Sequence, residues 1–127
     1  AANLGVQYMT LEVRRSNIVA QNLYKKMGFI ELGVRGVDTL QPEAVNMSPD
    51  YLAAHFGGRL NFRGCISTAG PLAYGTAEET DRVCRETLET MMAVRGYHFA
   101  PTHAIQDNSP TENVLAMYRA AHKYGQY

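Results

Sequence analysis

The sequence has no excess of charge of either sign and no long hydrophobic run. Its 12 basic residues balance its 12 acidic residues, which gives no electrostatic reason to expect nucleic acid or an anionic membrane as a partner. No apolar stretch approaches the ~20 residues of a membrane-spanning helix. The opening residues, Ala1–Gly5, lack the basic and apolar regions of a secretory signal. These absences predict a cytoplasmic protein.

Cysteine is also scarce, which argues against a disulfide scaffold. The two cysteines, Cys65 and Cys84, fall in a predicted strand and a predicted helix, and they do not have the spacing of a metal-binding pair. We expect both to be reduced thiols. What the chain does contain, 46% hydrophobic and 19% charged residues over 127 positions, is typical of a globular protein with a small core.

The first part of the chain has the pattern of one β-α-β unit. Apolar and polar residues alternate before a stretch with helical spacing, and Gly28 ends that stretch. Ser16 or Asn17 is suited to cap the helix. The expected elements are a strand over Tyr8–Arg14, a helix over Ile18–Met27 and a strand over Phe29–Val34.

The rest of the chain repeats a β-α pattern three times. Ser48 followed by Pro49 marks one helix start, and Thr76 followed by Glu79 marks another. Strands are expected over residues 37–41, 60–67 and 96–100, and helices over residues 49–56, from 77 to about 94, and from about 110 to 123. Strands that alternate with helices predict a parallel sheet with helical crossovers, an α/β fold.

Residues 1–35 resemble the GNAT acetyltransferases, specifically those that modify the N-terminal alanine of a ribosomal protein. The resemblance is carried by Leu11-Glu12-Val13-Arg14, Ser16-Asn17, Asn22-Leu23-Tyr24 and Gly28-Phe29. It implies that Glu12 is the general base for the acceptor amine, that Tyr24 is the general acid for the thiolate of coenzyme A, and that Asn17 contacts the pantetheine arm.

These three residues also have structural interpretations. A glutamate on a strand is usually solvated, and a tyrosine on an amphipathic helix usually packs in a core. That family holds the pyrophosphate of coenzyme A with a glycine-rich loop at a helix N-terminus. The sequence contains no such loop before the helix that carries Tyr24.

Residues 37–127 resemble the C-terminal part of the uroporphyrinogen decarboxylase superfamily, which also contains corrinoid and coenzyme M methyltransferases. The matching runs are Val37-Asp38-Thr39-Leu40-Gln41-Pro42, Met47-Ser48-Pro49, Phe56-Gly57, Phe62-Arg63-Gly64-Cys65-Ile66-Ser67, Gly75-Thr76-Ala77-Glu78-Glu79, Ala100-Pro101-Thr102-His103, Pro110-Thr111-Glu112-Asn113 and Tyr124-Gly125-Gln126-Tyr127. The resemblance implies a β/α barrel, of which the three β-α units are a part.

Barrels of this kind carry their chemistry at the carboxyl ends of the strands. That rule places Gln41, Ser67, Thr68 and His103 at the expected mouth. The resemblance implies that His103 is the main site residue, either as a hydrogen-bonding group for a carboxylate or, in the methyltransferases, as a zinc ligand. An idle loop histidine is the alternative.

Other polar residues in this part have ordinary explanations. Asn113 more often orients a helix than contacts a substrate, and Cys65 lacks the spacing of a zinc ligand. The remaining histidines show no pattern of partners and are expected at the surface or in structural roles: His55, His98 and His122.

The sequence therefore predicts two enzyme fragments, residues 1–36 and 37–127, joined near Gly33–Gly36 and inactive alone. The larger fragment suggests cofactor-free decarboxylation of a porphyrinogen, or methyl transfer with zinc or a corrinoid, and a small-molecule substrate. One alternative is acetyl-CoA-dependent acetylation of a protein N-terminus. Another is a recombined α/β module without catalysis, whose five strands form one sheet with exposed edges that favour self-association.

Overall fold

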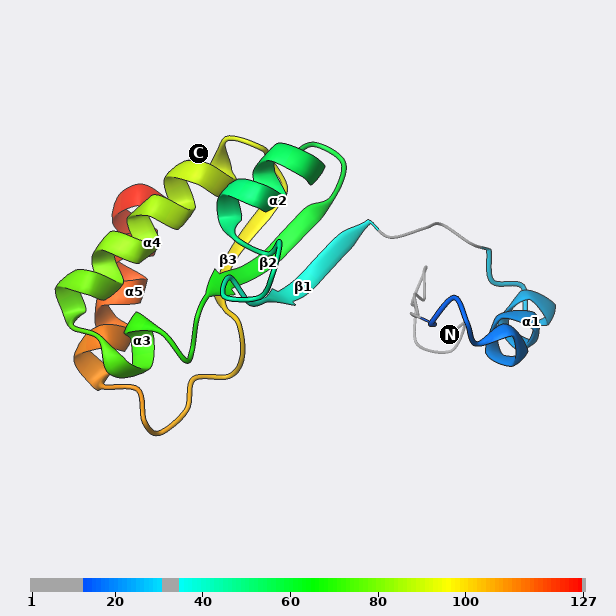
Figure 1. Cartoon of the computed structure of the whole chain (residues 1–127), viewed down its shortest axis with the longest axis horizontal. Coiled ribbons are helices and arrows are strands. Elements are labelled where there is room, and N and C mark those ends of the chain that lie inside the picture. The colour runs from blue at the N-terminus through cyan, green and yellow to red at the C-terminus, as the bar shows by residue number, and fades with distance from the viewer. Residues whose placement is uncertain (1–12, 31–34, 127) are drawn as a thin grey trace, which may run out of the picture. The chain divides into compact units, whose positions relative to one another are not determined.

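The computed structural model describes residues 13–30 and 35–126 of the chain, which divides into two compact units, residues 1–33 and 34–127 (Figure 1). In the first unit, helix α1 spans Ile18–Lys26. Asn17 is its N-cap, and the side-chain oxygen of Asn17 accepts the backbone N–H of Ala20 at 3.1 Å. The expected helix and its cap are therefore present.

The two strands expected on either side of α1 fall mainly on residues 8–12 and 31–34, which lie outside the described residues. Their described ends, Arg14 and Phe29, are not in strands. The carbonyl of Arg14 accepts the N–H of Asn17 at 2.8 Å in a turn, and the N–H of Phe29 donates back to the carbonyl of Tyr24 at 3.0 Å.

The second unit alternates strands and helices as the sequence predicts. Ser48 caps α2 and Thr76 caps α4, where Thr76 and Glu79 form a reciprocal capping box. The short helix α3 was not expected. The elements are β1 (Gly36–Leu40), α2 (Pro49–Phe56), β2 (Asn61–Ile66), α3 (Pro71–Tyr74), α4 (Ala77–Met92), β3 (Tyr97–Pro101) and α5 (Thr111–Tyr124).

The three strands form one parallel sheet in the order β1-β2-β3. Phe62 of β2 lies between Val37 of β1 and Tyr97 of β3 in the register. This confirms an α/β fold with parallel strands and helical crossovers. The alternative of a single five-stranded sheet finds no support in the described residues, in which the sheet contains three strands.

The middle of the sheet is irregular. The register between β1 and β2 shifts after Val37, and Thr39, Gly64 and Cys65 all have positive φ, at 54°, 117° and 69°. A Cβ on Gly64 would lie 2.7 Å from the backbone nitrogen of Leu40, so this position requires glycine. The irregularity leaves the Gly64 carbonyl to accept the hydroxyl of Tyr97 at 2.7 Å.

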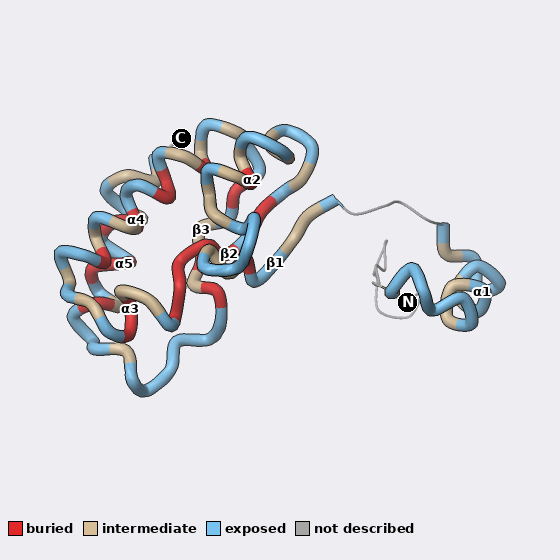
Figure 2. The backbone as a smooth tube through the Cα atoms, viewed as in Figure 1, coloured by how far each residue is buried: buried red, intermediate tan, exposed pale blue. Residues whose placement is uncertain are grey.

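The helices pack against one face of the sheet. Helix α4 contacts the helices α2 and α5 as well as the strands β2 and β3, so the three helices form one layer over the strands. Two buried clusters fill the space, one around Phe62, Leu88 and Met91 and the other around Ile66 and Met117. Figure 2 shows that the longest buried run follows β2 into its loop. The core therefore lies behind the strand ends that carry the expected mouth.

Among the described residues, no helix has both the length and the apolar character required to cross a membrane.

Candidate functional site

Parallel strands bring the residues that follow each strand to the same edge of the sheet. Gln41 follows β1, Ser67 and Thr68 follow β2, and Thr102 and His103 follow β3. This carboxyl edge is where open and closed parallel α/β sheets bind their ligands. The expected residues therefore share one edge, together with Thr102, which the sequence did not single out.

The loops after β2 and β3 are joined by two buried threonines. The hydroxyl of Thr102 accepts the backbone N–H of Thr68 at 3.2 Å, and the two hydroxyl oxygens lie 3.2 Å apart. The N–H of Thr102 also donates to the carbonyl of Ile66 at 2.8 Å, which extends the ladder beyond β3. Thr102 is fully buried and Thr68 is 7% exposed. The two loops therefore form one fixed structure beside His103.

Ser67 supports the same loop from within. Its side chain is buried, and its hydroxyl accepts the N–H of Ala69 at 3.2 Å. A Cβ on Gly70 would lie 3.1 Å from the Cβ of Ser67 and 3.4 Å from a carboxylate oxygen of Glu43, so the loops after β1 and β2 approach closely here. Ser67 is thus a structural neighbour of the edge, with little surface available to a ligand.

Asn113 connects α5 to the segment that follows β2. Its side chain is 2% exposed, and its amide nitrogen donates to the carbonyls of Pro71, Leu72 and Gly75 at 3.1, 3.3 and 2.9 Å. One side chain thus bonds three carbonyls of this segment, although the Pro71 carbonyl also accepts the N–H of Gly75 and the hydroxyl of Thr80. The orienting role expected for Asn113 is therefore seen, although it acts on α3 rather than as a cap of its own helix.

His103 is exposed on the loop between β3 and α5. The structure gives its ring no hydrogen bond to any described residue. A solvent-accessible imidazole beside a rigid loop is free to bond a ligand group. The described residues contain no group of three His, Cys, Asp or Glu side chains placed to hold a metal ion, so a zinc site at His103 lacks its other ligands here.

The two thiols are buried in different clusters, Cys65 with Phe62 and Cys84 with Ile66. Both are free cysteines. Burial raises the pKa of Cys65 to about 11, and burial with the nearby charge of Asp81 raises the pKa of Cys84 to about 12. Since the thiolate is the reactive form, neither thiol is prepared for catalysis.

The residues suggested by the acetyltransferase resemblance have structural partners where they are described. Asn17 is occupied as the cap of α1. Tyr24 is half-buried, and its ring packs edge to face against Phe29 with the centroids 5.8 Å apart. Glu12 lies outside the described residues. The described geometry therefore gives Asn17 and Tyr24 structural roles in and beside α1.

Comparison with known proteins gives no relative from which residue roles could be transferred: no family model, no curated protein and no solved structure matches the chain.

Proposed function

We propose that residues 35–126 are three consecutive β-α units of a barrel of the uroporphyrinogen decarboxylase type, and that His103 is their contribution to the site that binds a substrate carboxylate. The observation that carries the proposal is the winding of the sheet. Strand order follows chain order, and successive helices return on the same side.

Winding of this kind is typical of barrels. A doubly wound sheet reverses its strand order and covers both faces with helices, so its strands are apolar on both sides. Here Phe62 and Tyr97 are buried beneath the helices, whereas their neighbours Arg63 and His98 are exposed on the other face. One apolar face and one polar face favour a sheet that curves with its helices outside.

The proposed chemistry uses the carboxyl edge. In decarboxylation of the parent type, a substrate carboxylate leaves as CO2 and a proton takes its place on the carbon, without a cofactor. An imidazole can hold such a carboxylate through a charge-assisted hydrogen bond. His103 has an accessible ring next to the rigid Thr68–Thr102 pair, which suits it for positioning an anionic group.

We also propose that this chain does not turn over a substrate alone. Three strands cannot close around a pocket, because a barrel of this type needs eight. β1 and β3 are the edge strands of the described sheet. A working site would need further β-α units, and the exposed edges favour association of the chain with itself or with a polypeptide that supplies such units.

Methyl transfer is a second candidate on the same edge, with zinc or a corrinoid as cofactor. A tetrahedral zinc site needs three or four protein ligands, and the described residues contain no group of three His, Cys, Asp or Glu side chains placed to hold a metal ion. Acetylation with acetyl-CoA remains a candidate for the first unit on its sequence resemblance. A non-catalytic recombined module is favoured by the division into two compact units.

Binding and turnover can be measured separately. We expect the intact chain to bind uroporphyrin weakly, measured as quenching of the porphyrin fluorescence or a shift of its absorption. We expect His103→Ala to weaken this binding about tenfold through loss of one charged hydrogen bond. His122→Ala, an exposed histidine on α5, is the matched control. Equal binding by the wild type and His103→Ala would contradict the role of His103. CO2 release from uroporphyrinogen by the chain alone would contradict the proposed incompleteness.

The alternatives have their own readout. A ligand that binds only the folded state raises the melting temperature. A rise with acetyl-CoA that Tyr24→Phe reduces would support the acetyltransferase candidate. A rise with zinc that requires His103 would support methyl transfer. If no ligand shifts the melting temperature of the intact chain, the non-catalytic module is favoured.

A further inference from the structure

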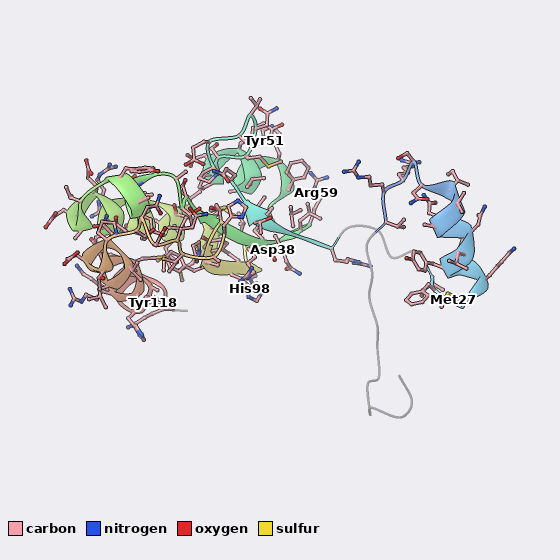
Figure 3. All side chains as sticks on the ribbon, turned by 90° about the horizontal axis from the view of Figure 1, so that it is seen from below. Met27, Asp38, Tyr51, Arg59, His98 and Tyr118 are labelled. Carbon is pink, nitrogen blue, oxygen red and sulfur yellow. The ribbon has the colours of Figure 1, made fainter. Side chains whose placement is uncertain are left out.

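A row of three polar side chains crosses the sheet on the face opposite the helices. Arg63 of β2 is in register with His98 of β3, and it forms an ion pair with Asp38 of β1. Figure 3 labels Asp38 and His98, which lie close to each other on the sheet and away from Tyr51 of α2. We call these three residues the open-face row. It lies in the first half of the strands, whereas His103 follows the end of β3.

One end of the row is already occupied. The guanidinium nitrogen Nη1 of Arg63 donates to both carboxylate oxygens of Asp38, at 2.8 and 3.1 Å. The backbone N–H of Thr39 donates to the same carboxylate at 2.6 Å. Asp38 is thereby fixed, and it holds Arg63 across the sheet. Arginine carries donors on two further nitrogens, and the structure gives these no acceptor among the described residues.

The other end of the row is unoccupied. His98 is exposed, and its ring makes no hydrogen bond to a described residue. The groups beside it on this face of the sheet are Arg63 from β2 and Asp38 beyond Arg63. The one carboxylate in the row, that of Asp38, lies on the far side of Arg63 from His98. It therefore does not bond both His98 and Arg63.

We propose that the open-face row binds a carboxylate anion between Arg63 and His98, with Asp38 as the residue that positions Arg63. An anion there takes one hydrogen bond from the remaining guanidinium donors and one from a ring N–H of His98. Register partners on adjacent strands are near enough for the two oxygens of one carboxylate to reach both side chains. Asp38 repels a doubly charged phosphate more strongly than a singly charged carboxylate, which favours the carboxylate.

The test is an NMR titration of the intact chain with sodium acetate against sodium chloride at the same ionic strength. We expect the ring signals of His98 to move with acetate, and those of His55 and His122 to stay. Arg63→Gln removes the response. His98→Gln weakens the binding of acetate, because it removes the second side chain that would bond the carboxylate. Asp38→Asn keeps a carbonyl oxygen for Thr39 and strengthens binding, because it removes the opposing charge.

Several outcomes overturn the proposal. It is wrong if the His98 signals move no more than those of His55, if chloride moves them equally, or if inorganic phosphate binds more tightly than acetate. Should Arg63→Gln fail to fold, Asp38→Asn decides the matter, and unchanged or weaker acetate binding would contradict the proposal. The inference goes beyond the decarboxylase proposal and fails separately from it, since His103→Ala leaves the acetate response of the open-face row intact.

Discussion

The side-chain amide of Asn113 donates to the backbone carbonyl of Gly75 at 2.9 Å, although the two residues are 38 positions apart. The same nitrogen reaches two more carbonyls of α3, so one residue of α5 holds the segment between β2 and α4. The loop after β2, which forms part of the carboxyl edge, is therefore followed by a segment that Asn113 of α5 holds in place.

Replacing Asn113 with alanine should be strongly destabilising. The change removes the side-chain donor of the Leu72 and Gly75 carbonyls, whereas the Pro71 carbonyl keeps the N–H of Gly75 and the hydroxyl of Thr80. An unsatisfied buried group costs about 1–3 kcal/mol. We expect the free energy of unfolding to fall by about 2–4 kcal/mol in urea titrations. Asn108→Ala is the control, because that exposed side chain makes one bond, to the hydroxyl of Tyr74. Equal losses in the two variants would contradict this assignment.

Thr102→Val should loosen the two loops while keeping the shape of the side chain. It removes the acceptor of the Thr68 N–H and the partner of the Thr68 hydroxyl, in a fully buried position. We expect a loss of about 1–2 kcal/mol in unfolding free energy and faster amide exchange at Thr68. Thr111→Val, at the exposed start of α5, should have little effect on that amide. Unchanged exchange at Thr68 in Thr102→Val would be evidence against the link.

The Asp38–Arg63 ion pair should contribute to acid sensitivity. The hydrogen bond from Arg63, and next the one from the N–H of Thr39, hold the pKa of the Asp38 carboxyl below its ordinary value of 3.8. A carboxyl group with a lowered folded-state pKa stabilises the fold above its unfolded value, and that stability is lost as the pH falls through the folded value. We expect the melting temperature of the wild type to fall more steeply below pH 3.8 than that of Asp38→Asn. Parallel curves for the two proteins would rule this out.

Both cysteines should be protected from alkylation in the folded chain. Burial raises the pKa of Cys65 to about 11 and contributes most to the pKa of about 12 for Cys84, so little thiolate forms at pH 8 and reagent access is blocked. We expect iodoacetamide to modify neither residue at pH 8 faster than the chain unfolds. Mass spectrometry across a urea series measures this, and chain in high urea provides the fully modified control. Rapid modification of one thiol without urea would show that its cluster opens.

The second unit should be stable without the first. All residues of both buried clusters belong to the second unit, from near Leu40 at its start to Tyr124 near its end. We expect a chain of residues 34–127 to unfold at the same urea concentration as the full chain, followed by circular dichroism. A marked fall in the midpoint would show that the first unit contributes to the fold of the second.

Local signals predicted α1, α2 and α4 well, because a capping side chain sets the start of each of these helices. Ser48 with Pro49 and Thr76 with Glu79 mark α2 and α4 where the structure has them. Helix α3 was not predicted, because it has only four residues and its N-cap, Gly70, has no side chain to form a capping hydrogen bond. At the described ends of the strands expected around α1, the alternation of residues gave no indication of the turn bonds made by Arg14 and Phe29.

The candidate site was predictable only as a set of positions. Parallel topology placed Ser67, Thr68 and His103 at one edge, but the bond between Thr68 and Thr102 depends on the register of two strands 34 residues apart. The open-face row depends on the same register. The left-handed backbone of Thr39 runs against the preference of a β-branched residue, so no local pattern indicates it.

The link between Thr68 and Thr102 has a consequence for how this edge can change. His103 directly follows Thr102, and Thr68 directly follows Ser67, so one pair of hydroxyls fastens both sides of the edge. An insertion in either loop close to the Thr68–Thr102 pair would displace both His103 and Ser67. Variation in ligand preference is therefore most easily accommodated farther along the second loop, between Ala104 and Ser109, where the backbone can lengthen without unfastening the pair.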